Sequence, residues 1–242
     1  MKYLFLFFIG NLSYSQSDSF ARISYQETFG DSDANLYSLY IHNNISLYQQ
    51  YYAPTEETTV MTIAGFVEPI IPSIYLLNKN LKQIIFQEGI AFKAIQAIEN
   101  DFSITWNITN DFKKIGDYNC QRATTNLKNN NYSVWYTQDI PLSFGPWKFY
   151  GLPGLILEIN DETNFYKIIA TKVNLGIDHE LVIKKMESFK VKTPVNIERY
   201  YQLRLQENDD IYNFYQSISP RDTYLKITTD YSGFMREPIK VK

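Results

Sequence analysis

Three acidic side chains, Glu158, Asp161 and Glu162, lie close together in the sequence and could act as a pair of catalytic acids. Two carboxyl groups held about 5 to 10 Å apart can hydrolyse a glycosidic bond, because one protonates the leaving oxygen while the other attacks or activates water. The same oxygens could bind Ca²⁺ weakly. Acidic residues are also common in turns because they are well solvated, so the catalytic, calcium-binding and solvated interpretations all stay open.

A second candidate for chemistry is Cys120, the only cysteine in the chain. A thiol becomes a strong nucleophile, the thiolate, when a histidine can take its proton. The chain has two histidines, His42 and His179. Nothing in the spacing brings either of them to Cys120. A lone cysteine in a strand is typical of a small buried hydrophobic residue, and it cannot form an intramolecular disulfide.

Several common active sites are excluded by the residue types present. Two histidines cannot supply a three-histidine zinc site, and the paired-histidine helix motif of metalloproteases does not occur. The chain also lacks the Gly-x-Ser-x-Gly pattern of serine hydrolases and the phosphate-binding glycine loop. We therefore assign no catalytic residue, expect no metal and no cofactor, and favour a non-enzymatic protein over an enzyme.

The composition is that of a folded protein built mainly from strands. Of the 242 residues 45% are hydrophobic, and 20 tyrosines and 16 phenylalanines are present, which favours β-strands. The 23 basic and 26 acidic residues give a net charge of −3, which argues against a nucleic-acid-binding protein. No repeat or flexible linker divides the chain, so we expect a single β-rich domain over residues 16–242.

The chain begins with a pattern that is typical of a secretory signal peptide. Lys2 is followed by the apolar run Tyr3–Ile9 and then by small polar residues that end at Ser15. We expect residues 1–15 to be removed, and the protein to reach the periplasm or cell envelope or to be secreted. Later apolar stretches are too short or too polar to span a bilayer, so we expect no membrane span in the mature chain.

The spacing of apolar residues predicts hairpins followed by one long helix. Residues Tyr118–Thr125 and Tyr132–Tyr136 alternate around a polar turn and form the clearest predicted hairpin. Leu181–Met186 predicts an edge strand. After Pro194 the apolar residues recur at three- and four-residue spacing as far as Tyr215, which predicts a helix. The predicted fold is mainly β (α+β), with a strongly curved antiparallel sheet or partial barrel and one long helix packed on it.

An unusual loop follows the predicted hairpin and extends over residues 135–160. Glycine lets the backbone approach other chains closely and proline fixes φ, so the loop should have one rigid shape. Its signature is formed by Gly145, Pro146, Gly151, Leu152, Pro153, Gly154, Leu155 and Ile156. The loop could close one end of the sheet as a set of tight turns. Alternatively, its aromatic residues could bind a ligand or a partner, because rigid aromatic side chains lose little entropy on binding: Trp135, Tyr136, Trp147, Phe149 and Tyr150.

The run Gly151–Ile156 resembles the signature of the GLPGLI family, whose name it spells in full. The upstream segment Gly116–Thr124 is similar to that family's strand of glycine, tyrosine and cysteine. The resemblance implies an exported protein of Bacteroidetes-type bacteria. It carries with it no established activity, substrate or catalytic residue.

Three hypotheses about function follow from these patterns. The first is a non-enzymatic envelope protein that binds an apolar small molecule or an envelope protein. The second is an envelope hydrolase that uses an acid pair or Cys120. The third is a structural or assembly factor at the outer membrane, which docks on its partner through the loop at 135–160.

Overall fold

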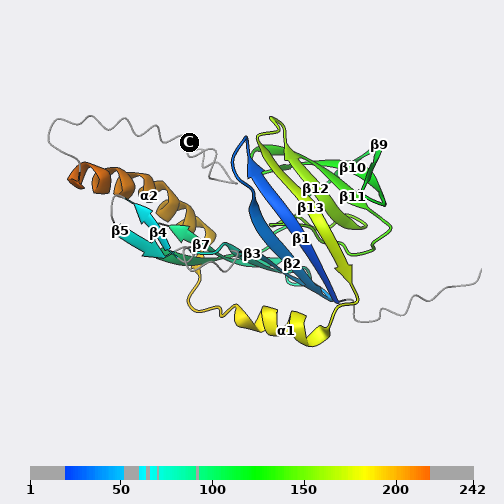
Figure 1. Ribbon diagram of the computed structural model, residues 1–242, viewed down its shortest axis with the longest axis horizontal. Helices are drawn as coiled ribbons and strands as arrows, with labels where there is room; N and C mark the ends of the chain where they lie inside the picture. Colours follow the sequence, from blue (N-terminus) through cyan, green and yellow to red (C-terminus); the bar gives the residue numbers. More distant parts are fainter. Residues whose placement is uncertain (1–19, 52–59, 64–65, 70, 91–92, 219–242) are drawn as a thin grey trace, which may run out of the picture.

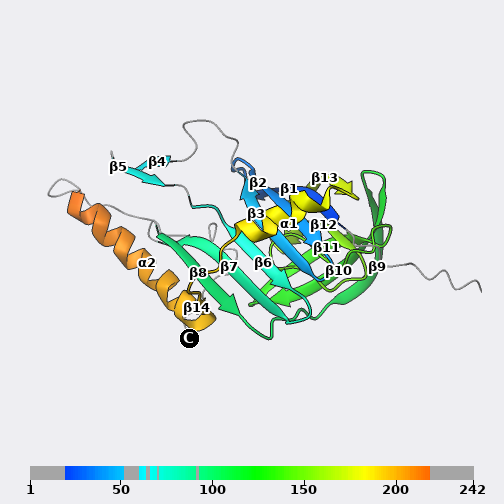
Figure 2. The same cartoon turned by 90° about the horizontal axis from the view of Figure 1, so that it is seen from below.

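The computed structural model describes residues 20–51, 60–63, 66–69, 71–90 and 93–218 of the protein. Its main feature is a sheet of twelve strands in the spatial order β14-β8-β7-β6-β3-β2-β1-β13-β12-β11-β10-β9, whose labels can be followed in Figure 1 and Figure 2 together. Two other strands, β4 and β5, form a separate antiparallel pair. The bounds of the strands are β1 Phe20–Phe29, β2 Asn35–His42, β3 Ile45–Tyr51, β4 Val60–Ile63, β5 Phe66–Pro69, β6 Ile74–Asn78, β7 Gln83–Ile90, β8 Lys93–Glu99, β9 Asn107–Ile115, β10 Tyr118–Leu127, β11 Asn130–Thr137, β12 Leu155–Asp161, β13 Tyr166–Leu175 and β14 Val195–Asn196.

Neighbouring strands of the large sheet are antiparallel, except that the short β14 runs parallel to β8. Strand β1 lies between β2 and β13, so Tyr25 is paired with Tyr37 on one side and with Ala170 on the other. The predicted hairpin is confirmed as β10 and β11, in which Thr124 is paired with Ser133. Strands β14 and β9 are the two ends of the order, so the sheet is open. The prediction of a mainly β fold is confirmed at this level.

Two helices accompany the sheet in the described part of the chain, α1 at His179–Ser188 and α2 at Ile197–Ile218 (Figure 2). The helix predicted after Pro194 is present as α2, which contacts β7 and β8. The prediction of a single helix is wrong, because α1 was not foreseen.

Helix α1 occupies the residues that were predicted to form an edge strand, Leu181–Met186, so that prediction is wrong. A short apolar run does not by itself distinguish a strand from a helix. The preceding residue Asp178 decides the outcome, because its Oδ1 accepts a hydrogen bond of 2.9 Å from the N–H of Glu180 and caps the helix. Val182 is then fully buried against the sheet.

Aromatic rings fill the core and connect the sheet to α2. Tyr37 stacks on Tyr48 with 4.6 Å between ring centroids, and Tyr48 lies 6.3 Å from Tyr75. Tyr75 stacks on Phe86 at 5.7 Å, and Phe86 meets Tyr200 of α2 edge to face at 4.9 Å. Such ring pairs contribute about 0.5–1.5 kcal/mol each beyond their burial. These four tyrosines therefore serve to pack the core across β2, β3, β6, β7 and α2.

Several sequence-based expectations concern residues or properties that the structure does not describe. Residues 1–15 lie outside the described residues, so the signal peptide stays a prediction. The single domain over 16–242 and export to the envelope also stay predictions. Neither helix in the described residues combines the length and the apolar content needed to cross a membrane.

Candidate functional site

The first of the three predicted acids, Glu158, is tied into an ion pair. Its Oε2 lies 2.7 Å from Lys113 Nζ, and its Oε1 accepts a hydrogen bond of 2.8 Å from Asn160 Nδ2. Burial alone would raise the pKa of Glu158, but the hydrogen bonds from Lys113 and Asn160 outweigh burial and lower it. The side chain is therefore ionised at neutral pH and has no proton to donate to a leaving group.

The other two predicted acids have separate roles. Asp161 shapes the turn between β12 and β13, because its Oδ1 accepts a hydrogen bond of 3.0 Å from the N–H of Tyr166. Glu162 lies beside the neighbouring hairpin and accepts a hydrogen bond of 3.0 Å from Asn131 Nδ2. Among the described residues, no three His, Cys, Asp or Glu side chains gather as a set of metal ligands. The predicted acid cluster is thus divided between an ion pair, a turn and a surface cleft.

Cys120 on β10 is completely buried, and its burial raises the pKa of the thiol to about 11. The histidines lie elsewhere, since His42 stacks on Phe20 with 4.4 Å between ring centroids and His179 lies 5.8 Å from the same ring. The thiol is protonated at neutral pH, and neither histidine is placed to deprotonate it. The chemistry of a cysteine hydrolase is therefore not available at this position.

We predict that Cys120 is unreactive in the folded protein. A water-soluble aromatic disulfide reagent at pH 8 should modify the native chain at least about tenfold more slowly than the chain unfolded in guanidinium, because both the raised pKa and the burial must be overcome. The release of the coloured thiol measures the rate. Equal rates for native and unfolded protein would contradict the burial of this side chain.

The aromatic residues predicted to bind a ligand lie mostly inside the core. Tyr136 is 1% exposed, Trp147 3%, Phe149 0% and Tyr150 9%. Trp135 is partly exposed, and Lys113 Nζ lies 4.5 Å from the centroid of its ring. A role for these five residues in binding stays a prediction.

The signature loop folds into the core, and it is held there by hydrogen bonds and apolar contacts. Leu152 and Ile156 are at most 1% exposed, and the O–H of Tyr25 on β1 donates a hydrogen bond of 2.7 Å to the carbonyl oxygen of Ile156. Gly154 lies so close to the end of β11 that a Cβ atom there would be 2.0 Å from the carbonyl oxygen of Thr137. The close approach of two backbones explains why glycine occupies this position.

A buried cation joins the same loop to the far half of the sheet. Lys148 is 2% exposed, and its Nζ lies 3.5 Å from Oε2 of Glu99 and 4.5 Å from the ring centroid of Phe86. Glu99 also accepts a hydrogen bond of 2.5 Å from Lys128 Nζ. The opposite charge and the aromatic face offset the cost of burying the ammonium group.

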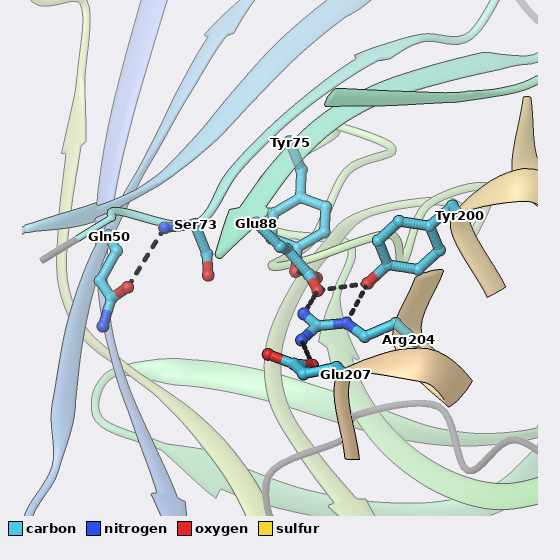
Figure 3. Close-up of polar contacts among 7 residues, drawn as sticks. All are labelled: Gln50, Ser73, Tyr75, Glu88, Tyr200, Arg204 and Glu207. Atoms are coloured by element: carbon cyan, nitrogen blue, oxygen red, sulfur yellow. Dashed lines mark hydrogen bonds and ion pairs between the residues drawn. The ribbon is translucent and has the colours of Figure 1, made fainter. Parts of the chain in front are cut away.

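A second buried network fixes α2 to the sheet. Figure 3 shows the carboxylate of Glu88 on β7 facing Arg204 and Tyr200 of α2 and Tyr75 of β6. Arg204 also donates a hydrogen bond of 3.0 Å to the Tyr200 hydroxyl and one of 2.8 Å to Glu207. Burial, together with the charge of Glu88, raises the pKa of Tyr200 well above its ordinary value. Because every group here has a protein partner, this network stabilises the helix position and is not an open site.

Gln50 and Ser73 lie beside this network in Figure 3, at the ends of β3 and the segment before β6. The Ser73 N–H donates a hydrogen bond of 3.2 Å to Gln50 Oε1. This contact joins the end of β3 to the segment that enters β6.

The best candidate for a binding site is a surface cleft of about 570 Å³, which we call the Trp106 groove. It lies where the chain enters β9, along β10 and β11 and beside the turn after β12. Its volume is within the range of about 300–1,000 Å³ that small-molecule sites have. The groove is lined by Thr105, Trp106, Asn107, Arg122, Thr124, Thr125, Asn126, Asn131, Tyr132, Ser133 and Glu162.

Strand alternation places the polar side chains of the groove on one face. Arg122, Thr124 and Asn126 are two residues apart on β10, so their side chains point to the same side of the sheet. Thr124 is paired with Ser133 and Asn126 with Asn131 across the hairpin, which extends the polar face onto β11. Hydrogen bonds order this face. Arg122 Nε donates to Ser133 Oγ at 2.8 Å, and Asn126 Nδ2 donates to Asn131 Oδ1 at 2.8 Å.

Apart from Glu162, which was one of the three candidate acids, these groove residues were not identified from the sequence, although the hairpin that carries most of them was predicted. The usable signal was the run of hydrogen-bonding side chains at Arg122, Thr124 and Asn126, at the two-residue spacing of one strand face. The contributions of Trp106 and Glu162 could not be found in this way, because they come from segments before and after the hairpin.

Comparison with known proteins identifies the group to which the sequence is related. A family model described as "N-glycanase peptide, N-terminal domain" matches residues 75–204. Two crystal structures of PNGF-II are similar to this fold. The structure in space group C2 has a TM-score of 0.52, 17% identity, and coverage of 79% of this chain and 33% of its own. The one in space group P21 has a TM-score of 0.53, 16% identity, and coverage of 79% and 34%.

No curated protein sequence matches this chain. The chain spans about a third of the length of the PNGF-II structures that it resembles, and at this level of identity the likeness concerns the fold alone.

The match corrects two sequence-based conclusions. The resemblance of Gly151–Ile156 to the GLPGLI family was a wrong assignment, because the family whose model matches is the N-glycanase one. The hypothesis of a non-enzymatic envelope protein that binds an apolar ligand or a protein partner is also wrong, since the matching family is described as an N-glycanase domain. The geometry, and not the match, argues against the two hydrolase alternatives, because Glu158 is ionised in an ion pair and Cys120 is buried with a raised pKa. The match does not test the alternative of an outer-membrane assembly factor.

Proposed function

The chain belongs to the family of N-glycanase peptide N-terminal domains, and from this we propose that it takes part in the enzymatic processing of N-linked glycans. In this proposal the described domain engages the glycan of an N-glycosylated protein that is being processed. The chain spans only about a third of the PNGF-II structures. The proposal therefore assigns it binding of the glycan and does not assign it the whole reaction.

One observation carries the proposal. The matched range, residues 75–204, covers 130 of the 242 residues and includes every residue that lines the Trp106 groove. The region related to N-glycanases is therefore also the region with an open cleft of polar side chains. Hydrogen-bonding groups at the rim of an aromatic surface suit a sugar, which has hydroxyl groups on its edge and C–H groups on its faces.

The proposal predicts that the chain binds a glycoprotein through its N-glycans. The protein should be made in a bacterial host, because Asn107 and Asn131 of the groove lie in Asn-x-Ser/Thr sequences that a eukaryotic host could glycosylate. An immobilised glycoprotein should bind the chain, and the same glycoprotein should bind at least about tenfold more weakly after its N-glycans have been removed. Mass spectrometry of the mixture detects any glycan that is released.

The matched control is the chain after irreversible heat denaturation, which should neither bind nor release glycan. Equal binding to the glycosylated and the deglycosylated protein, with no released glycan, would contradict a role in N-glycan processing.

We also propose that the open sheet is strongly curved, as a partial barrel, around the signature loop. The loop contacts both halves of the sheet, which supports this shape. Trp147 lies 6.2 Å from Tyr132 of β11 between ring centroids, whereas its neighbour Lys148 lies 4.5 Å from the ring centroid of Phe86 of β7. The convex side of β10 and β11 would then present the Trp106 groove to a large substrate.

A further inference from the structure

The geometry of the Trp106 groove points to a specific class of ligand, and this inference rests on the proposed function. We propose that the groove binds a short neutral segment of an N-glycan, with one pyranose ring against Trp106 and its hydroxyl groups at the polar face of β10 and β11. The proposal adds a site and a preference for neutral over acidic sugars to the proposed function.

The apolar part of the site is a fixed indole. Trp106 is partly exposed and lines the groove, while its Nε1–H donates a hydrogen bond of 2.9 Å to the carbonyl oxygen of Tyr150. Its ring also lies 6.0 Å from the ring of Phe149 in the core. Because the indole is already oriented, a sugar that packs its C–H face on the ring loses little entropy in ordering it.

The polar part of the site is a chain of hydrogen bonds along one rim. Asn126 donates to Asn131 at 2.8 Å, and Asn131 donates to Glu162 at 3.0 Å. Each amide has two N–H groups and a carbonyl oxygen with two lone pairs, so both amides keep groups that can bind ligand after these contacts. Side chains of this kind can bind two adjacent hydroxyl groups at once, which is the pattern that pyranose rings present.

The opposite rim carries a cation whose charge is already balanced. Arg122 Nε donates to Ser133 Oγ at 2.8 Å, and its Nη1 lies 3.3 Å from Oδ2 of Asp111. The carboxylate of Glu162 stands on the other rim. A sugar carboxylate or phosphate placed between the two rims would be repelled by Glu162, while the charge of Arg122 is already balanced by Asp111. The groove therefore favours neutral sugars.

The test is isothermal titration of the full chain with a free oligomannose glycan and with a sialylated glycan of similar size. We expect the sialylated glycan to bind at least about fivefold more weakly. Asn126→Ala and Asn131→Ala should each weaken oligomannose binding about tenfold, because each removes groups that bind the hydroxyls and disorders its neighbour. Trp106→Leu should abolish measurable binding.

Two controls keep the outcome interpretable. Asn119→Ala lies on the same strand, β10, outside the groove, and should bind like the unchanged chain. Thermal unfolding should show that the two groove asparagine variants, whose side chains are exposed, fold normally. If all groove variants bound oligomannose as tightly as Asn119→Ala does, the groove assignment would be overturned while the proposed function stood. If the unchanged chain bound neither glycans nor the glycoprotein, the proposed function would fail as well.

Discussion

Replacing Gly154 by alanine should destabilise the protein by about 3 kcal/mol or more and lower its melting temperature by roughly 10 °C. The added Cβ would stand 2.0 Å from the carbonyl oxygen of Thr137 and 2.7 Å from its carbonyl carbon. These atoms belong to the backbone at the end of β11, so they cannot move aside as a flexible side chain could. Chemical denaturation followed by circular dichroism measures the loss.

Gly116→Ala is the matched control for this prediction. Gly116 lies in the turn between β9 and β10 with a φ of +57°, but no atom would lie within 4 Å of an added Cβ. Its substitution should cost only about 1 kcal/mol, from the left-handed backbone alone. If Gly154→Ala were no more destabilising than Gly116→Ala, the close contact between the loop and β11 would be refuted.

Replacing Arg204 by methionine should destabilise the protein by about 2–4 kcal/mol, because it leaves the half-buried carboxylate of Glu88 without the charge of its guanidinium partner. The side chains of Arg204 and Glu88 are 17% and 15% exposed, so water compensates for the loss only in part. Amide hydrogen exchange in α2 should increase together with the fall in global stability, because this network holds the helix on β7.

Two further variants show whether the loss of stability comes from the Glu88–Arg204 contact or from removing any positive charge from α2. Arg199 is on the same helix and exposed, and Arg199→Met should change the stability by less than about 0.5 kcal/mol. The double variant Glu88→Gln with Arg204→Met should be less destabilised than the sum of the two single variants, because the unpaired charge is then absent. Additive losses would show that the two side chains act independently.

Much of the fold was predictable because it rests on local patterns. Alternation over Tyr118–Thr125 and Tyr132–Tyr136 gave the hairpin of β10 and β11, and the spacing of apolar residues after Pro194 gave α2. Helix α1 was missed because the six residues Leu181–Met186, which are apolar and basic, fit both the two-residue period of a strand and the 3.6-residue period of a helix. There the hydrogen bond that Asp178 Oδ1 accepts from the N–H of Glu180 and the burial of Val182 decided the structure.

The candidate site was less predictable, because its parts come from separate segments. The Trp106 groove combines the entry to β9, the hairpin of β10 and β11, and Glu162 after β12. The rigid loop at 135–160 was recognised from its glycines and prolines, but which of its aromatic residues face solvent depends on contacts with distant strands. Phe149 and Trp147 are buried because β11 and β13 supply rings on which they pack.

The sequence by itself determined that this chain forms strands rich in tyrosine, a stiff loop around Gly154 and a helix after Pro194. These features follow from side-chain periodicity and backbone restrictions that act over a few residues. Only the tertiary structure decided that Glu88 pairs with Arg204, that Lys148 is buried against Glu99, and that an open groove with polar side chains lies along β10 and β11. The reason is that burial and charge pairing depend on which distant segments are in contact, and the pairing of the strands determines those contacts.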